Sequence, residues 1–411
     1  MMRDSSAALL LKGYAWLPDS RRASADGVVQ TRLMGRRAFG IGGPSAARFF
    51  YDERHVRRAG AVPGAVQSTL FGHGAVHTLD SLEHRHRKAM FLGLFTSDRI
   101  ADLVARTGAA WDAAAPGWAG RPVSLLDASA AVLAEAVGGW MGLPPDGDLA
   151  GDCVAMVDGF GTAGPRHWRA RAARRRQEQR LADVVATVRD GRAGGATPLD
   201  VVARHRADDG HLLTRETAAV ELLNIARPTI AVSWFVAFAA HALHRWPGHR
   251  DRLRAGDPAY AEAFAHEVRR FYPFAPFVGG RAAGDVEYAG HAIPGGSLVL
   301  LDLYGQNHDP ALWKDPYRFE PERFLGPDAD AALEPFTLVP QGAGNPATGH
   351  RCPGEPNTVA LLSDLAIRVA RLDYDVPPQD LGIPLDRIPA RPRDGMVVVP
   401  RKARAWLAAR V

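Results

Sequence analysis

The sequence has 411 residues and a formal net charge of +5, carried almost wholly by arginine because lysine occurs at only four positions. Its length permits two or three domains, but no Gly/Ser or Pro linker and no internal repeat divides it, which favours a single domain, 1–411. Two distant cysteines exclude a disulfide framework, and no apolar stretch approaches the roughly 20 residues of a membrane span. We therefore expect a soluble, cytoplasmic protein without integral membrane association.

Hydrophobic periodicity predicts six longer helices. They cover residues 97–114, 126–142, 174–190, 214–245, 258–272 and 357–372. Shorter runs rich in β-branched residues predict strands at 27–33, 38–42, 286–289, 297–301 and 396–399. Long helices with small, scattered strand pairs predict a mainly α fold of the α+β class.

The densest basic run covers residues 166–180 (RHWRARAARRRQEQR). A run of this kind can contact nucleic acid or an acidic partner. It is local, however, and Trp168 is its only large aromatic residue, so a solvated helix face is the better interpretation. We expect no nucleic-acid partner.

Within the predicted helix 214–245, Arg227 and Pro228 break two local rules. Proline removes a backbone donor and kinks a helix, and an unpaired buried guanidinium costs several kcal/mol. Violations of this kind mark functional sites. The alternative is a helix break at Pro228 that lets Arg227 reach solvent.

The next predicted helix carries Glu267 and Arg270 at i and i+3, where their side chains can pair. Alone, this spacing fits an ordinary surface pair. Arg323 follows in a Pro-punctuated loop, and the three charged groups precede a glycine-rich stretch that contains a cysteine. The order of these groups is far more specific than any one of them.

That stretch is residues 341–357 (QGAGNPATGHRCPGEPN), with Cys352 near the start of the last predicted helix. Its glycines allow the backbone to approach a flat ligand closely. The helix dipole, His350 and Arg351 are expected to favour the thiolate of Cys352. A buried structural cysteine is the alternative, and we expect it for Cys153, but it does not require so much glycine.

In these motifs the chain resembles a cytochrome P450 over nearly its whole length. Glu267 and Arg270 match the Glu-x-x-Arg helix of that family, Arg323 its third structural partner, and Cys352 its proximal haem ligand. Two departures stand out. Positions 345, 348 and 350 are Asn, Thr and His, against the usual Phe-x-x-Gly-x-Arg-x-Cys-x-Gly signature, and the loop is longer. The usual acid and alcohol pair of the central helix is replaced by residues 224–228 (NIARP).

The chain is most similar to the fatty-acid peroxygenase branch, including its alkene-forming decarboxylases. That branch carries an Arg-Pro pair on the distal helix and an extended loop ending Gly-His-Arg-Cys-Pro-Gly-Glu, reproduced here at 341–355. Residues 164–168, 272–277 and 301–305 also agree with it. The resemblance implies haem b between the helix at 214–245 and the loop at 341–357, with hydrogen peroxide as co-substrate and no required redox partner.

By the same resemblance, Arg227 with Pro228 holds the substrate carboxylate, which then serves as the acid-base group. His77 falls where relatives carry His or Gln on the distal side, and His tends to accompany decarboxylation to a terminal alkene. A histidine satisfied by local backbone is the competing interpretation. Phe71, Phe274 and Phe277 are candidates to line an alkyl tunnel, although at least one is expected to be ordinary core.

Haem propionates require cations. His84 and Lys88 share a helix face at i and i+4 and match the propionate-binding helix of the family. Arg58 matches another cationic position, with either a propionate or a surface role, and Gly342 and Gly354 are expected against the cofactor. A zinc site at His84 and the nearby histidine at 86 lacks a third ligand with suitable spacing, and the loop glycines form no dinucleotide fingerprint.

The sequence therefore predicts a haem-thiolate peroxygenase that oxidises fatty acids at the α or β carbon, giving hydroxy acids, terminal alkenes or both. A monooxygenase that depends on redox partners and acts on another small molecule is the alternative. A haem-binding sensor without turnover is a third hypothesis.

Overall fold

The computed structural model describes residues 3–191, 195–327 and 329–401, and within them a mainly helical fold with small sheets. The α-helices are α1 (Ser6–Lys12), α2 (Trp16–Arg22), α3 (Pro44–Phe50), α4 (Gly64–Val66), α5 (Ser81–Leu94), α6 (Ser97–Ala114), α7 (Leu125–Met141), α8 (Leu149–Asp158), α9 (Pro165–Asp190), α10 (Pro198–Ala203), α11 (Arg215–Ile230), α12 (Val232–Arg245), α13 (His249–Ala255), α14 (Pro258–Phe271), α15 (Leu303–Asn307), α16 (Ala329–Ala332) and α17 (Glu355–Arg371). The predicted α+β class is confirmed.

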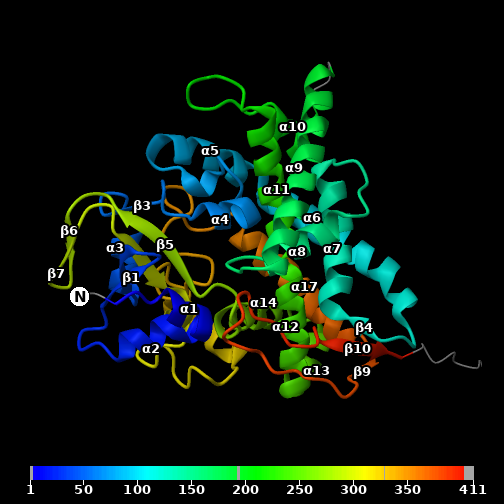
Figure 1. The fold of residues 1–411 in the computed structure, drawn as a ribbon. Helices are drawn as coiled ribbons and strands as arrows, with labels where there is room; N and C mark the ends of the chain where they lie inside the picture. The colour runs from blue at the N-terminus through cyan, green and yellow to red at the C-terminus, as the bar shows by residue number, and fades with distance from the viewer. Residues whose placement is uncertain (1–2, 192–194, 328, 402–411) are drawn as a thin grey trace, which may run out of the picture.

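The strands form three sheets. Their bounds are β1 (Val29–Leu33), β2 (Arg36–Ile41), β3 (Val56–Arg57), β4 (Val123–Ser124), β5 (Phe277–Ala282), β6 (Val286–Tyr288), β7 (His291–Ile293), β8 (Leu298–Asp302), β9 (Tyr374–Asp375) and β10 (Val397–Pro400). The largest sheet has the order β1-β2-β8-β5-β3, and only its β2–β8 pair is parallel. Figure 1 shows this sheet with α1 to α3 on one side of the molecule and the long helices on the other.

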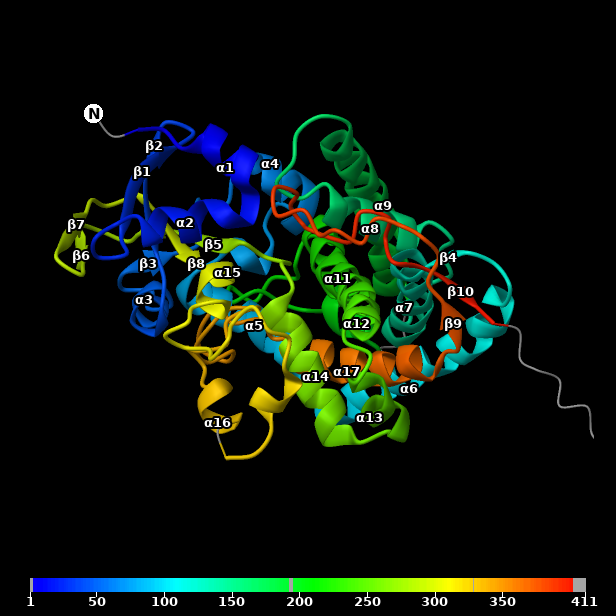
Figure 2. The ribbon, with the colours of Figure 1, turned by 90° about the horizontal axis from the view of Figure 1, so that it is seen from below.

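The helices α11 and α12 form the centre of the helical part, with α7, α9 and α17 around them (Figure 2). Together they span Arg215–Arg245, and 94% of the most apolar window is buried inside the protein, as in a core helix. The interruption lies at Ala231, three residues beyond Pro228. Pro228 lacks only its own backbone N–H group, so the hydrogen bonds of the residues that follow it can still form. The amide of Ala231, for example, donates to the carbonyl of Arg227 at 2.9 Å.

The predicted helices match α6, α7, α14 and α17 within two residues. Helix α9 starts nine residues before the predicted position 174, because its first turns are too polar to show periodicity. The prediction of a solvated basic face is partly wrong. Trp168 is 62% exposed, but Arg174 is only 2% exposed, and its guanidinium donates to Glu178 and to the carbonyl of Leu70.

Strand β5 was not predicted, because the adjacent Gly279 and Gly280 hide the β-branched signal. The structure explains one of them. A Cβ on Gly280 would lie 2.2 Å from a methyl carbon of Val56, so only glycine lets these two chain segments approach. Strand β5 begins at Phe277, which lines the cavity described below.

Candidate active site

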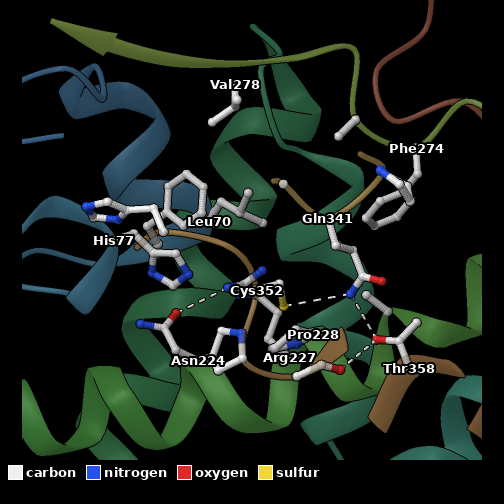
Figure 3. A pocket seen from close by; sticks show the side chains of 18 of the residues that line it. Leu70, His77, Asn224, Arg227, Pro228, Phe274, Val278, Gln341, Cys352 and Thr358 are labelled. Carbon is white, nitrogen blue, oxygen red and sulfur yellow. Dashed lines mark hydrogen bonds between the residues drawn. The ribbon is translucent and has the colours of Figure 1, made fainter. Parts of the chain in front are cut away.

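A cavity of about 360 Å³ lies between helices α11 and α12, the loop that carries Cys352, and the segment around His77. It takes in every candidate site residue of the sequence analysis except Arg58. These are Phe71, His77, His84, Lys88, Arg227, Pro228, Phe274, Phe277, Gly342, Cys352 and Gly354. Segments more than 250 residues apart in the chain thus meet around one space. Figure 3 shows His77, Arg227 and Cys352 around it.

The cysteine loop is shaped by left-handed glycines. Gly342 has φ +97°, and a Cβ there would lie 2.5 Å from the hydroxyl of Tyr51. The amide of Cys352 donates to the carbonyl of Gln341 at 3.0 Å, and the Gln341 amide nitrogen lies 3.7 Å from the sulfur (Figure 3). The loop therefore holds Sγ at the cavity wall, ahead of helix α17, with Gly354 offering no side chain between them.

The expectation that the helix dipole, His350 and Arg351 favour the thiolate of Cys352 is wrong in the protein without a bound metal. Burial is the largest influence and raises the pKa of Cys352, and Glu355 adds to that rise. Lys88 and Arg269 oppose it, whereas Arg351 pairs with Glu355 at 2.6 Å. A buried thiol of this kind loses its proton when a metal cation binds it, so the donor suits an iron ligand better than a free nucleophile.

The predicted charged trio is present. The guanidinium of Arg270 binds both oxygens of Glu267 at 2.7 Å, and Arg323 lies 3.2 Å from the same carboxylate. Arg270 also donates to the carbonyl of Asn307 at 2.7 Å. Glu267 and Arg270 are almost completely buried. The trio joins α14 to the segment before the cysteine loop, and none of the three lines the cavity.

Arg227 is the central polar group of the cavity. Its side chain is buried, with the residue 6% exposed, and one terminal nitrogen donates to the Asn224 amide oxygen at 3.2 Å. Its Nε has no hydrogen-bond partner and no carboxylate pairs with it in the part of the chain that the structure describes. Burial first, and then Arg174, lower the pKa of Arg227 to about 9, so it stays charged at neutral pH. The alternative in which Arg227 reaches solvent is wrong.

His77 lies in a short 3-10 helix, Val76–Thr78, and its ring packs on Phe71 at 4.7 Å between centroids. Its Nδ1 is buried without a hydrogen-bond partner among the described residues. The competing interpretation, a histidine satisfied by local backbone, is therefore not supported. Burial first, and then Arg227, lower the pKa of His77 to about 3, so the imidazole is neutral near pH 7.

Two of the predicted propionate residues face the cavity from α5. His84 is buried and stacks on His350 at 3.7 Å between centroids. Lys88 donates to the carbonyls of Gly349 and Arg351, the latter at 2.5 Å, and burial lowers its pKa to about 8. From the sequence, His350 was interpreted as a departure from a motif and as a neighbour of Cys352, not as a propionate residue. Its place beside His84 depends on a contact across more than 260 residues that no local pattern reveals.

Arg58 lies outside the cavity lining. Its guanidinium donates to the carbonyl of Gly279 at 3.0 Å and lies 4.1 Å from the ring centre of Phe50. Burial lowers its pKa. It also lies over the ring of Tyr51, which does line the cavity, at 5.1 Å. Arg58 is therefore buried one layer behind the site, and a surface role is excluded.

The three aromatic candidates differ in their surroundings. Phe71 packs on His77, and Phe274 packs on Phe235 of α12 at 4.9 Å. Phe277, at the start of β5, also contacts Trp16 at 6.2 Å and joins a separate core cluster. All three line the cavity, and all three are partly buried side chains packed against a core cluster, Phe71 and Phe274 against the main helical one and Phe277 against that of Trp16.

These residues fit a haem group. The cavity is mainly apolar, a single sulfur faces it from a glycine loop, and basic side chains lie at one edge. His84 Nδ1 is buried and lacks a hydrogen-bond partner in the described ranges, so it can donate to a carboxylate once protonated or in the right tautomer. His350 Nε2 lies 3.6 Å from Asp80 and 3.9 Å from Glu53, so it already faces carboxylates of the protein. Carboxylates are what the propionates of haem present.

Comparisons with known proteins agree. A profile described as Cytochrome P450 matches residues 257–356, which include the charged trio and Cys352. Carnosic acid synthase from Rosmarinus officinalis is 40% identical over 104 residues, 25% of this chain and 20% of that protein. The matches to the first curated relatives span only about a fifth to a third of those proteins.

Solved structures match over nearly the full chain. Cytochrome P450SP alpha (CYP152B1) in complex with (R)-ibuprophen is 41% identical, with 97% of this chain and 98% of that chain covered and a TM-score of 0.91. Cytochrome P450EX alpha (CYP152N1) with myristic acid is 36% identical, with 97% and 98% covered and a TM-score of 0.90. A variant of cytochrome P450 OleT in complex with arachidonic acid is 34% identical, with 97% of both chains covered and a TM-score of 0.91.

The cysteine loop, the charged trio and full-length similarity at these identities converge on one assignment. The chain belongs to the cytochrome P450 family and, within it, to the CYP152 group of fatty-acid peroxygenases.

Proposed function

We propose that this protein uses hydrogen peroxide to oxidise fatty acids at the α or β carbon, giving hydroxy acids, terminal alkenes or both. One observation carries the proposal. Arg227 presents a charged guanidinium, without a carboxylate partner among the described residues, to an apolar cavity that also contains Cys352. A buried cation in such a space needs an anion, and a carboxylate on an alkyl chain satisfies both the charge and the apolar walls.

The ligands of the similar structures support this class of substrate. Myristic acid, arachidonic acid and ibuprofen are named in three of them, and each is a carboxylic acid with an apolar body. The guanidinium fork can bind both oxygens of such a group, which fixes its orientation. The α and β carbons then lie in a constant position relative to the acid, and regioselectivity follows from that position.

The protein offers few acid-base groups at the site. No Asp or Glu lines the cavity within the described ranges, and His77 is neutral near pH 7. The substrate carboxylate held by Arg227 is therefore the group best placed to accept and return the peroxide proton. This makes the reaction dependent on the acid that it oxidises.

Haem, bound through Cys352, supplies the oxidising chemistry when peroxide arrives, and we place it between α11–α12 and the loop at 341–357. His84, Lys88 and His350 are positioned to hold its propionates, with Arg58 behind them. The apolar walls, which include Phe71 and Phe274, exclude water from the alkyl chain. His77 lines the same cavity, and its imidazole can donate one hydrogen bond to the reacting groups.

Both outcomes balance with peroxide alone. Hydroxylation consumes one fatty acid and one peroxide and gives one hydroxy acid and one water. Decarboxylation gives one terminal alkene, one carbon dioxide and two waters, because the two electrons removed from the acid reduce the peroxide. Neither reaction requires NADPH or an electron-transfer protein.

The test is to incubate haem-loaded protein with a long-chain fatty acid and hydrogen peroxide, without reductase, and to analyse the products by gas chromatography. Hydroxy acids or alkenes one carbon shorter are expected. Conversion only with NADPH and electron-transfer proteins would show a monooxygenase instead. Fatty-acid binding without any turnover would show a sensor.

A further inference from the structure

Glu221 is a completely buried carboxylate on α11, six residues before Arg227, and it does not line the cavity. It accepts hydrogen bonds from three donors. These are the Val76 amide at 2.8 Å, the Arg87 guanidinium at 2.9 Å and the Asn224 side-chain amide at 3.1 Å. Burial raises the pKa of the Glu221 carboxyl, and these donors oppose that rise. Because all three of these partners donate, they favour the ionised form, whereas a protonated carboxyl would add a donor that none of them accepts.

We propose that Glu221 is a positioning residue that fixes the His77 turn and the Arg227 guanidinium relative to each other. The inference rests on the proposed function, because it concerns the residues that hold the fatty acid. Its basis is the way in which the two carboxylate oxygens divide their partners.

Oxygen Oε1 faces the His77 side. It accepts from the amide of Val76, directly before His77, and from Arg87, whose guanidinium also lies 3.5 Å from the carbonyl of Gly74. His77 makes no hydrogen bond of its own among the described residues, so the backbone next to it carries its placement. These contacts tie the turn to α5 and α11 at once.

Oxygen Oε2 faces the Arg227 side. It accepts from Nδ2 of Asn224, which leaves the amide oxygen of Asn224 pointing at Arg227, 3.2 Å from the guanidinium. The orientation of the amide is thus set by Glu221, since a carboxylate can only accept. Figure 3 shows Asn224 in contact with Arg227 at the cavity. That bond is the only hydrogen bond of the Arg227 side chain in the part of the chain that the structure describes.

Glutamine at position 221 cannot serve both sides. If its oxygen faces Val76 and Arg87, its NH2 group meets Nδ2 of Asn224, so the Asn224 amide turns over and presents NH2 to Arg227. If its oxygen faces Asn224, its NH2 group meets the donors of the His77 turn. Each orientation places donors against donors on one side.

The experiment compares haem-loaded wild type, Glu221→Gln and the control Glu216→Gln, which lies on the same helix but is exposed and pairs with its neighbour. Fatty-acid affinity is read from the change in haem absorption during titration, and the alkene-to-hydroxy-acid ratio from gas chromatography. For Glu221→Gln we expect either a Kd about tenfold higher or a shifted product ratio, while Glu216→Gln keeps both wild-type values.

Two further variants each disrupt one of the two sets of Glu221 contacts, the one at Oε1 or the one at Oε2. They provide the test if Glu221→Gln does not fold. Val76→Pro removes the amide donor and also replaces a buried side chain at the cavity wall, and proline fits the first position of a short helix after Ala75 in an extended conformation (φ −67°, ψ 150°). It is expected to shift the product ratio with Kd within twofold. Asn224→Ala is expected to raise Kd about tenfold.

Wild-type values for Kd and product ratio in Glu221→Gln, or in both Val76→Pro and Asn224→Ala, would overturn the positioning role. Failure of the wild type itself to bind or convert fatty acids would instead overturn the proposed function. The two failures are therefore distinguishable.

Discussion

Replacing Arg227 by methionine should have opposite effects on the empty and the fatty-acid-bound protein. The side chain is buried with Nε unpaired, and its pKa falls from 12.5 to about 9. At 1.36 kcal/mol for each pH unit, the charged form is disfavoured by about 5 kcal/mol relative to water. Because folding lowers the pKa of this base, the cost is fully present below pH 9. Methionine of similar length removes it, so we expect the ligand-free variant to be about 1–4 kcal/mol more stable.

In the fatty-acid-bound protein, the same substitution should be unfavourable, because it removes the partner of the carboxylate. Two charge-assisted hydrogen bonds from guanidinium to carboxylate contribute roughly 3–6 kcal/mol together, so Arg227→Met should raise the fatty-acid Kd by about two to four orders of magnitude. A ligand at 100 times its Kd stabilises the folded state by about 2.7 kcal/mol. Fatty acid should therefore raise the melting temperature of wild type and leave that of the variant unchanged.

The assay is thermal unfolding of haem-loaded wild type and Arg227→Met, each without fatty acid and with it at about 100 times the wild-type Kd. The fatty alcohol of the same chain length is the matched ligand control, because it lacks the carboxylate. Equal stabilisation of both proteins by the acid, or equal stabilisation of wild type by acid and alcohol, would refute the reasoning.

Two other substitutions, His77→Gln and Lys88→Met, give three further predictions. His77→Gln should move products from alkene towards hydroxy acid, measured by gas chromatography, and an unaltered ratio would remove His77 from the mechanism. Folding lowers the pKa of His77 from 6.5 to about 3. Between these pH values the unfolded protein binds a proton at His77 and the folded protein does not, so the folded protein loses stability as pH falls from about 6.5 towards 3. In denaturant unfolding, wild type should therefore lose about 2 kcal/mol more than His77→Gln between pH 7 and 4.5, and parallel losses would contradict this. Lys88→Met leaves the carbonyls of Gly349 and Arg351 without their donor. It should therefore lower haem content and reduce the free energy of unfolding by about 1–3 kcal/mol. Unchanged haem content and melting temperature would show that Lys88 is dispensable.

The sequence predicted the parts of the molecule whose signals are local. Helices α6, α7, α14 and α17 appeared within two residues of their predicted positions. The Cys352 loop could be singled out by its glycines, and the Arg227–Pro228 pair because it breaks the rules of its own helix. Strand β5 was missed because Gly279 and Gly280 interrupt its β-branched pattern, and Gly280 is there for a tertiary contact with Val56. Glu221 was missed for a related reason, since its partners Val76 and Arg87 lie 145 and 134 residues away.

Electrostatics was the least predictable property. The neighbours of Cys352 in sequence suggested a thiolate, but burial dominates and raises the pKa, and the groups that lower it include Lys88 from α5. Arg174 was assigned to a solvated face because the basic run around it is local and has only one large aromatic residue, yet its side chain is buried. Burial of an individual charged side chain depends on how whole helices pack, which periodicity in a polar stretch does not report.

The most direct measurement is a crystal structure of the haem-loaded protein with a long-chain fatty acid. Capture of the acid by Arg227 predicts both carboxylate oxygens at about 2.7–2.9 Å from the guanidinium, with the alkyl chain between Phe71 and Phe274. A carboxylate bound elsewhere, with Arg227 still bonded only to Asn224, would contradict the account.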